Sequence, residues 1–186
     1  MYPRGFSTYK DVEGAAERLL RASGAPRLAN KVAIDVFAIA NRCCHFDIAQ
    51  VPDLNLGGSV LGAFLPEFDL VLLKANCLET RKRFSLAHEL GHAQLEYAFG
   101  SGEGLFGPAR SVYYRCEDLD MEFDTGQLVS RPRAEVLANK FAASILMPEA
   151  ILRDAWRMTA QLPDCASLLG VSLQSLKIRL HEFEMI

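Results

Sequence analysis

The sequence predicts an α+β fold in which a small antiparallel sheet packs on helices and a short helical tail ends the chain. Two runs of strand-forming residues, 60–65 and 70–74, flank the turn Pro66-Glu67-Phe68-Asp69 and predict a β-hairpin. Apolar residues recur at helical spacing in longer segments on both sides of this hairpin. We therefore expect one α+β domain, residues 1–158, and a helix-turn-helix-like tail, residues 159–186, packed on it.

Composition and charge limit the classes of protein to which this chain can belong. Half of the 186 residues are hydrophobic and 23% are charged, which is typical of a globular domain and excludes a wholly disordered chain. The net charge of −3 argues against a domain whose main task is to bind nucleic acid. Residues 1–11 lack the apolar core of a signal peptide, and no apolar stretch is long enough to span a membrane. We expect a cytoplasmic protein that contacts neither nucleic acid nor membrane directly.

The N-terminal part of the chain is predicted to contain two helices and a strand. Residues 11–22 have apolar side chains at helical spacing, and Gly24 follows as a stop signal. Asn30 is expected to cap a second helix. The buried side of that helix would carry Val32, Ile34, Val36, Phe37 and Ile39. Residues 46–52 then predict a short strand ahead of the hairpin.

The middle of the chain is predicted to contain a long helix, about residues 80–99, which begins at Thr80 and ends at Gly100. A glycine-rich tract, 100–108, follows it, and residues 109–126 are expected to be partly extended.

Proline marks the boundaries of the next two helices. Pro132 suits the first turn of a helix over about 132–147, and Pro148 separates that helix from another at 149–157.

The C-terminal tail is predicted to form two short helices around the turn Gly170-Val171. Asp164 is expected to cap the first helix and Ser172 the second, residues 173–182. Lys177 and Arg179 lie on the second helix, but two positive charges are too few to indicate DNA binding. We expect the tail to pack on the domain.

The sequence His88-Glu89-Leu90-Gly91-His92 is an HExxH motif inside the predicted long helix. Residues four apart share a face of a helix, so both imidazoles can bind one metal ion. Glu89 projects toward the place of a metal-bound water and can act as a general base. A pair of core histidines is the alternative, but it does not explain Glu89, because glutamate is almost never buried unpaired.

A catalytic zinc site needs a third protein ligand. A histidine three turns further on is excluded, since positions 95 and 98 are Leu95 and Ala98. Glu135 is a candidate, with Asn139 four residues later on the same helix face to hold a ligand imidazole through a hydrogen bond. The alternative is that Glu135 interacts with the helix dipole and Asn139 is a surface residue. These residues alone leave both interpretations open.

Two segments together resemble the ImmA/IrrE family of metallo-endopeptidases. The first is Arg83-Phe84-Ser85-Leu86-Ala87-His88-Glu89-Leu90-Gly91-His92. The second is Glu135-x-x-Ala138-Asn139-x-Phe141-Ala142-Ala143-x-x-Leu146-Met147-Pro148. The likeness covers about residues 60–182 and extends to the tail. It departs from the family's pattern at Ser85, where threonine is usual, and in the long interval between His92 and Glu135.

This resemblance implies a gluzincin-like core, in which a small antiparallel sheet packs on the HExxH helix and on a second helix that bears the glutamate. It implies that His88, His92 and Glu135 bind zinc, that Glu89 is the base and that Asn139 supports a ligand. A His₂-carboxylate site can also accept manganese or another divalent ion. Members of the family cleave a partner repressor, so the implied substrate is a regulatory protein, namely a helix-turn-helix repressor.

Two weaker features bear on substrate binding. The acidic run between Glu117 and Asp124 is either a solvated edge or a surface for a basic partner. The strand 70–74 precedes the motif helix, and as an edge strand it could hold an extended peptide by strand addition.

Two functional hypotheses follow. The first is a zinc-dependent endopeptidase that acts on a regulatory protein. The second is a metal-stabilised module that binds a repressor or antitoxin without cutting it, which would have no need of Glu89.

Overall fold

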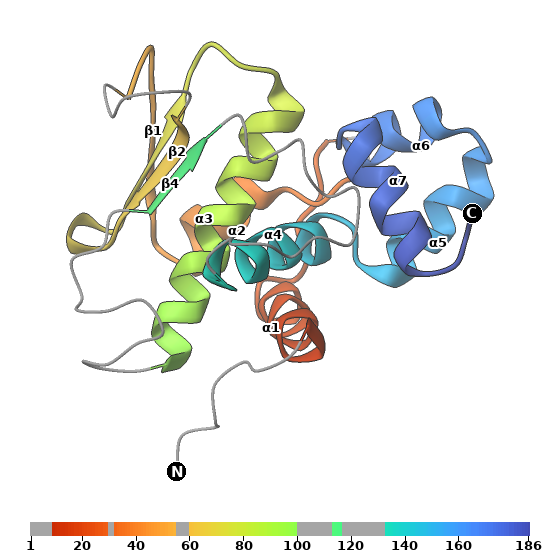
Figure 1. Cartoon of the computed structure of the whole chain (residues 1–186), viewed down its shortest axis with the longest axis horizontal. Coiled ribbons are helices and arrows are strands. Elements are labelled where there is room, and N and C mark those ends of the chain that lie inside the picture. The colour runs from red at the N-terminus through yellow and green to blue at the C-terminus, as the bar shows by residue number, and fades with distance from the viewer. Residues whose placement is uncertain (1–8, 30–31, 55–59, 100–112, 117–132) are drawn as a thin grey trace.

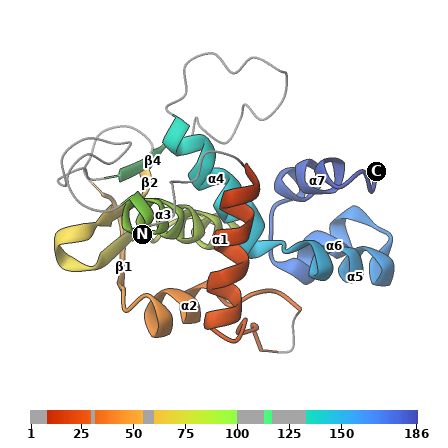
Figure 2. The same cartoon turned by 90° about the horizontal axis from the view of Figure 1, so that it is seen from below.

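The computed structural model describes residues 9–29, 32–54, 60–99, 113–116 and 133–186. Within these ranges the chain forms an α+β fold with seven α-helices and a four-stranded sheet. Figures 1 and 2 show the sheet on one side of α3 and the helices α5, α6 and α7 gathered at the opposite end of the molecule. The helices are α1 (Tyr9–Ala22), α2 (Val36–Cys43), α3 (Glu79–Phe99), α4 (Arg133–Leu146), α5 (Glu149–Thr159), α6 (Leu162–Leu169) and α7 (Leu173–Glu182).

The sheet is mixed, and the prediction of an antiparallel sheet was wrong for one of its strands. The strands are β1 (Asp47–Val51), β2 (Val60–Leu65), β3 (Leu70–Lys74) and β4 (Tyr113–Cys116), in the order β1-β3-β2-β4. The hairpin strands β2 and β3 are antiparallel as expected, with the 3₁₀ turn Pro66–Phe68 between them. Strand β4 pairs with the other side of β2, while β1 joins the sheet beside β3 and runs parallel to it.

The predicted role of 70–74 as an edge strand is also wrong. Strand β3 pairs with β1 on one side and with β2 on the other, so its backbone has no free side for a peptide. Among the described strands, β1 and β4 are the outer ones.

Two of the three predicted caps were wrong, and both errors have local causes. Helix α2 begins at Val36 rather than after Asn30, which lies outside the described residues. The Asp35 carboxylate caps it by accepting a hydrogen bond from the Ala38 backbone N–H at 3.0 Å. Ahead of this helix, Val32 and Ala33 form a bend and Ile34 forms an isolated antiparallel bridge with Arg27, so these residues are not helical. Helix α6 begins after Gln161 with Pro163 in its first turn, which leaves Asp164 inside the helix. Ser172 caps α7 as expected.

The core lies between the sheet and the helices. Phe64, Val71 and Leu73 of the sheet are buried against the apolar side of α3, which contributes Leu86 and Leu90. On its other side α3 packs along α4, which in turn packs on α1. Helix α3 therefore packs between the sheet and α4, and both contacts hold its position.

Two buried arginines connect the tail to the rest of the molecule. Arg83 on α3 donates from Nε to the Gly170 carbonyl at 3.0 Å and from NH2 to the Ile34 carbonyl at 2.8 Å. Arg179 on α7 is 2% exposed and donates to the Met147 carbonyl and to Glu13 of α1. The division at residue 158 stays a prediction, but these contacts join α6 and α7 to α1 and α3. None of the described helices has the length and apolarity needed to cross a bilayer.

Candidate metal centre

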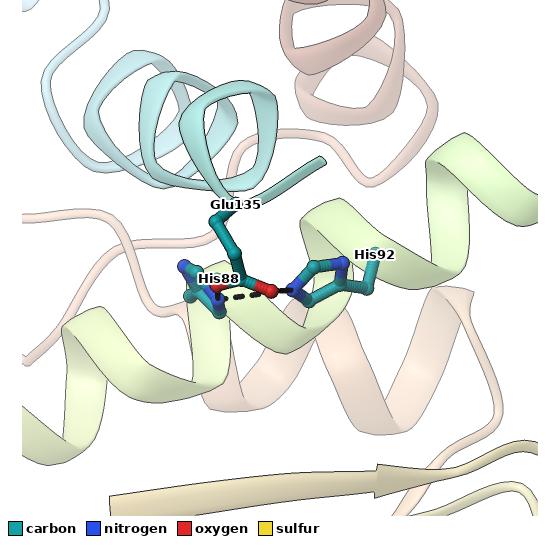
Figure 3. A group of neighbouring side chains, drawn as sticks. All are labelled: His88, His92 and Glu135. Carbon is teal, nitrogen blue, oxygen red and sulfur yellow. Dashed lines mark hydrogen bonds and ion pairs between the residues drawn. The ribbon is translucent and has the colours of Figure 1, made fainter. Parts of the chain in front are cut away.

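The two histidines of the motif lie one turn apart on α3 and point to the same side of it. Both side chains are buried, with 1% of each residue exposed. Their Nε2 atoms are 3.0 Å apart, and Figure 3 shows both rings directed toward α4. The 3.6-residue period of the helix produces this arrangement, because positions four apart fall on one face.

Helix α4 supplies the third side chain. Glu135, in the first turn of α4, reaches His88 Nε2 through Oε2 at 3.1 Å and His92 Nε2 through Oε1 at 3.2 Å (Figure 3). Residues 43 positions apart are thus brought together by the packing of α3 on α4. Within the described part of the chain, His88, His92 and Glu135 form the group of side chains that could hold a metal ion.

The spacing of these atoms fits a tetrahedral ion. Two ligand atoms that each lie 2.0–2.1 Å from a tetrahedral zinc ion are about 3.3 Å apart. The two ring nitrogens are 3.0 Å apart, and a different carboxylate oxygen of Glu135 faces each of them, at 3.1 and 3.2 Å. One ligand atom from each residue can be chosen so that all three lie within 4.8 Å of one another. Nitrogen and carboxylate oxygen donors are also the ligand types of catalytic zinc sites. The residues therefore fit a divalent ion without rearrangement of the backbone.

Asn139 sets the tautomer of His88. Its Oδ1 lies 2.9 Å from His88 Nδ1, and an amide oxygen can only accept, so Nδ1 carries the proton and donates it. With Nδ1 as the donor to Asn139, Nε2 is the nitrogen that faces the Glu135 carboxylate, and it would give its lone pair to a bound metal ion. Two lone-pair donors that face each other at hydrogen-bond distance require a cation or a proton between them. Asn139 is 5% exposed and is therefore a buried residue, not a surface one.

Glu135 is held in its charged form. Burial alone would raise its pKa, but hydrogen bonds and charge interactions with His88 and His92 hold the pKa of this carboxyl far below its usual range. The side chain remains 16% exposed, so the site is open to solvent on this side. A carboxylate beside two imidazoles is a donor set that a divalent transition-metal ion takes.

Glu89 lies beside the metal group but is not part of it. The residue is completely buried on α3, and it faces β2, where Gly62 approaches its carboxylate. A carboxylate one residue from a ligand histidine, and outside the ligand group, is the residue type that acts as a general base in HExxH sites. The structure thus separates Glu89 from the three converging ligand atoms, as the HExxH spacing requires.

Sequence reasoning missed the structural importance of Gly91. A methyl group added there would lie 3.0 Å from the Ala138 Cα and 3.1 Å from its carbonyl oxygen, so the two helix backbones touch at this point. This contact brings Glu135 within reach of the histidines. A glycine inside a helix does signal a close approach, but the sequence does not indicate which element approaches.

The remaining candidates from the sequence lie away from the site or outside the residues that the structure describes. His45 and His181 are exposed and take no part in the metal group. Arg179 is buried in ion pairs with Glu13 and Glu182, so it is not a surface charge for DNA. The glycine-rich tract and the acidic run 117–124 lie outside the described residues.

The chain is similar to a curated metalloprotease. The chain is 31% identical over 137 residues, 72% of its length, to the radiation response metalloprotease IrrE of Deinococcus radiodurans. The resemblance to the ImmA/IrrE family is confirmed. The chain spans 37% of the length of that relative. No family model matches the chain.

The fold of this chain also occurs in a solved structure. A Mycobacterium tuberculosis transcriptional regulator superposes with a TM-score of 0.59 at 16% identity. The match covers 92% of this chain and 46% of the regulator. At this identity the similarity concerns the fold alone.

Proposed function

We propose that this chain is a cytoplasmic, zinc-dependent endopeptidase with a gluzincin-like core. The observation that carries the proposal is the convergence of His88, His92 and Glu135, whose facing side-chain atoms lie 3.0–3.2 Å apart. The similarity to a curated metalloprotease supports it. His88, His92 and Glu135 would hold the ion, and Asn139 would orient His88. A bound zinc ion would polarise the scissile carbonyl and lower the pKa of a water molecule.

The protein's own residues supply the proton transfers. The Glu89 carboxylate takes a proton from the attacking water as the new C–O bond forms at the scissile carbonyl. It then gives this proton to the leaving amine when the C–N bond breaks. Both transfers need a carboxylate at a fixed distance from the ligand group, which the position of Glu89 on the same helix as His88 and His92 provides.

The proposed substrate is a regulatory protein, namely a helix-turn-helix repressor. The family resemblance supports this choice, and the curated relative is a metalloprotease of a radiation response. The chain would recognise such a substrate through protein contacts rather than on DNA. Its net charge is −3 and Arg179 of the tail is engaged in buried ion pairs.

Comparing Glu89→Gln with wild type tests the function directly. We would incubate zinc-loaded protein with a proteome-derived peptide library and identify new N-termini by mass spectrometry. Glu89→Gln should lower the cleavage rate about 10²–10⁴-fold, because a general base is lost, while bound zinc is unchanged. Glu79→Gln is the matched control, since Glu79 is an exposed residue at the start of the same helix. Equal cleavage by wild type and Glu89→Gln would contradict the proposal. Partner binding without cleavage by either protein would favour the non-catalytic module.

A further inference from the structure

Strand β2 comes unusually close to the Glu89 carboxylate at Gly62. A methyl group added at Gly62 would lie 3.3 Å from Glu89 Oε1. Its next neighbours would be Leu73 Cδ2 and Ser85 Cβ, both at 3.5 Å, which is ordinary van der Waals contact. The one contact that is too tight is therefore with the carboxylate. A methyl group at position 62 would therefore crowd the Glu89 carboxylate, whereas His88, His92 and Glu135 are not among its nearest neighbours.

The backbone around Gly62 is not free to move away. Gly62 pairs with Leu73 of β3 on one side and with Arg115 of β4 on the other. The register between β2 and β4 shifts between Val60 and Gly62, which makes Leu61 an extra residue, as in a β-bulge. Bulges bend a strand locally and occur often beside active sites, where they redirect a residue.

The opposite wall is equally fixed. Ser85 and Glu89 lie one turn apart on α3 and face the sheet, and the helix between them is buried through Leu86 and Ala87. On the other side of α3, Gly91 allows the helix backbone to lie in close contact with α4. Since neither α3 nor β2 can yield easily, the Glu89 side chain would be the part that moves.

We infer that Gly62 is a positioning residue: its missing side chain, at a bulge in β2, sets where the Glu89 carboxylate stands relative to the metal group. The inference rests on the proposed function. A methyl group at position 62 must displace the carboxylate by a few tenths of an ångström. Catalytic groups need placement within about 0.5 Å, so such a shift is large enough to weaken the action of the base.

Binding of acetohydroxamate depends on the position of the general base, so it can be measured without knowing the substrate. It chelates a metal ion through two oxygens, and its hydroxyl proton passes to a neighbouring carboxylate. We would load wild type, Gly62→Ala and Glu89→Gln with cobalt and titrate each with acetohydroxamate, following visible absorption. Glu89→Gln should raise the apparent Kd at least tenfold. Gly62→Ala should raise it about five- to tenfold with cobalt stoichiometry unchanged, because the nearest neighbours of the added methyl include none of the ligands.

A control and a rescue make the assignment specific. Gly14→Ala is the same substitution on α1, where the methyl would approach only the end of the Arg18 side chain, and it should leave the Kd unchanged. Glu89→Asp shortens the side chain and removes the conflict. Adding Gly62→Ala to Glu89→Asp should therefore change the Kd less than twofold.

The outcomes separate the inference from the proposed function. The inference alone would be overturned if the Kd of Gly62→Ala for acetohydroxamate is within twofold of the wild-type value while Glu89→Gln loses affinity. Wild type that takes up no cobalt, or Glu89→Gln that binds the probe as tightly as wild type, would overturn the proposed function and this inference with it. If Gly62→Ala does not fold, recovery of soluble protein in the Gly62→Ala/Glu89→Asp double variant supports the inference. Failure to recover would refute it.

Discussion

At the scale of single residues, the site depends on which ring nitrogen of His88 carries a proton. The Asn139 amide oxygen accepts from Nδ1, so Nε2 is the nitrogen that faces Glu135. The pair spans α3 and α4, so one hydrogen bond fixes both a tautomer and a ring orientation. Such supporting contacts commonly tune metal affinity as strongly as some direct ligands do.

Replacing Asn139 with alanine should weaken zinc binding about 10- to 100-fold, because the ring of His88 loses its orienting acceptor. Competition with a chelating dye measures this affinity. Asn139→Asp keeps an acceptor oxygen and should retain most of the affinity. Asn41→Ala, on the exposed side of α2, is the matched control. Equal zinc affinities for Asn139→Ala and Asn41→Ala would show that the hydrogen bond does not support the site.

At the scale of elements, the packing of α3 on α4 determines whether the ligands meet. The backbones touch at Gly91 and Ala138, where a single added carbon would lie 3.0–3.2 Å from three atoms of α4. Two of these atoms belong to the backbone and cannot move independently of the helix. A second inter-element contact joins α1, α4 and α7, where Lys140 and Arg179 lie between Glu13 and Glu182.

Gly91→Ala should force the two helices apart. We expect it to lower the free energy of unfolding of the metal-free protein by about 1–3 kcal/mol, the usual cost of overpacking, and to weaken zinc binding. Urea unfolding and zinc titration measure the two effects. Gly14→Ala should be neutral or slightly stabilising, since alanine is the better helix former. A Gly91→Ala protein with wild-type stability and affinity would show that this contact does not set the helix spacing.

Glu13→Gln should lower stability at neutral pH and lose its effect in acid. Burial opposes ionisation of Glu13, but hydrogen bonds and charge interactions with Lys140 and Arg179 lower its pKa. A lowered native pKa adds stability above the ordinary glutamate value of about 4.3, and this stability disappears as the pH falls toward the native value.

The expected loss for Glu13→Gln is about 1 kcal/mol at pH 7, the size of a hydrogen bond at a partly exposed charged group. Urea unfolding of the chelator-treated protein at pH 7 and at acidic pH measures it. Glu17→Gln, which lies on the exposed side of α1, should have no effect at either pH. A loss for Glu13→Gln that is the same at both pH values would rule out this ion cluster as its source.

At the scale of the whole molecule, the predictable features are the local ones. Helical periodicity and turn residues placed α1, α4 and the hairpin within a few residues of their observed bounds. The position of β1 beside β3 depends on β4, a strand distant in sequence, and no local pattern encodes it. Arginine is usually a surface residue, so the sequence does not predict the burial of Arg83 and Arg179. Their guanidinium groups are buried because they donate to backbone carbonyls that only the tertiary fold brings near.

The site shows the same limit. The spacing of His88 and His92 predicts a shared helix face, because it depends only on the helix period. Glu135 and Asn139 could be chosen only through the family resemblance, since no period connects residues separated by a long interval. Gly62 and Gly91 carry a signal for close approach but none for the partner, which only the packing of α3 against β2 and α4 reveals.

The central claim is that His88, His92 and Glu135 hold one metal ion, and elemental mass spectrometry of purified protein tests it most directly. Wild type should contain about one zinc ion per chain and Glu135→Ala very little, because two ligands rarely suffice for a stable catalytic site. Glu149→Ala, an exposed glutamate on α5, should match wild type. Folded wild type that neither contains nor takes up a divalent metal, or Glu135→Ala that retains the full amount, would contradict the account.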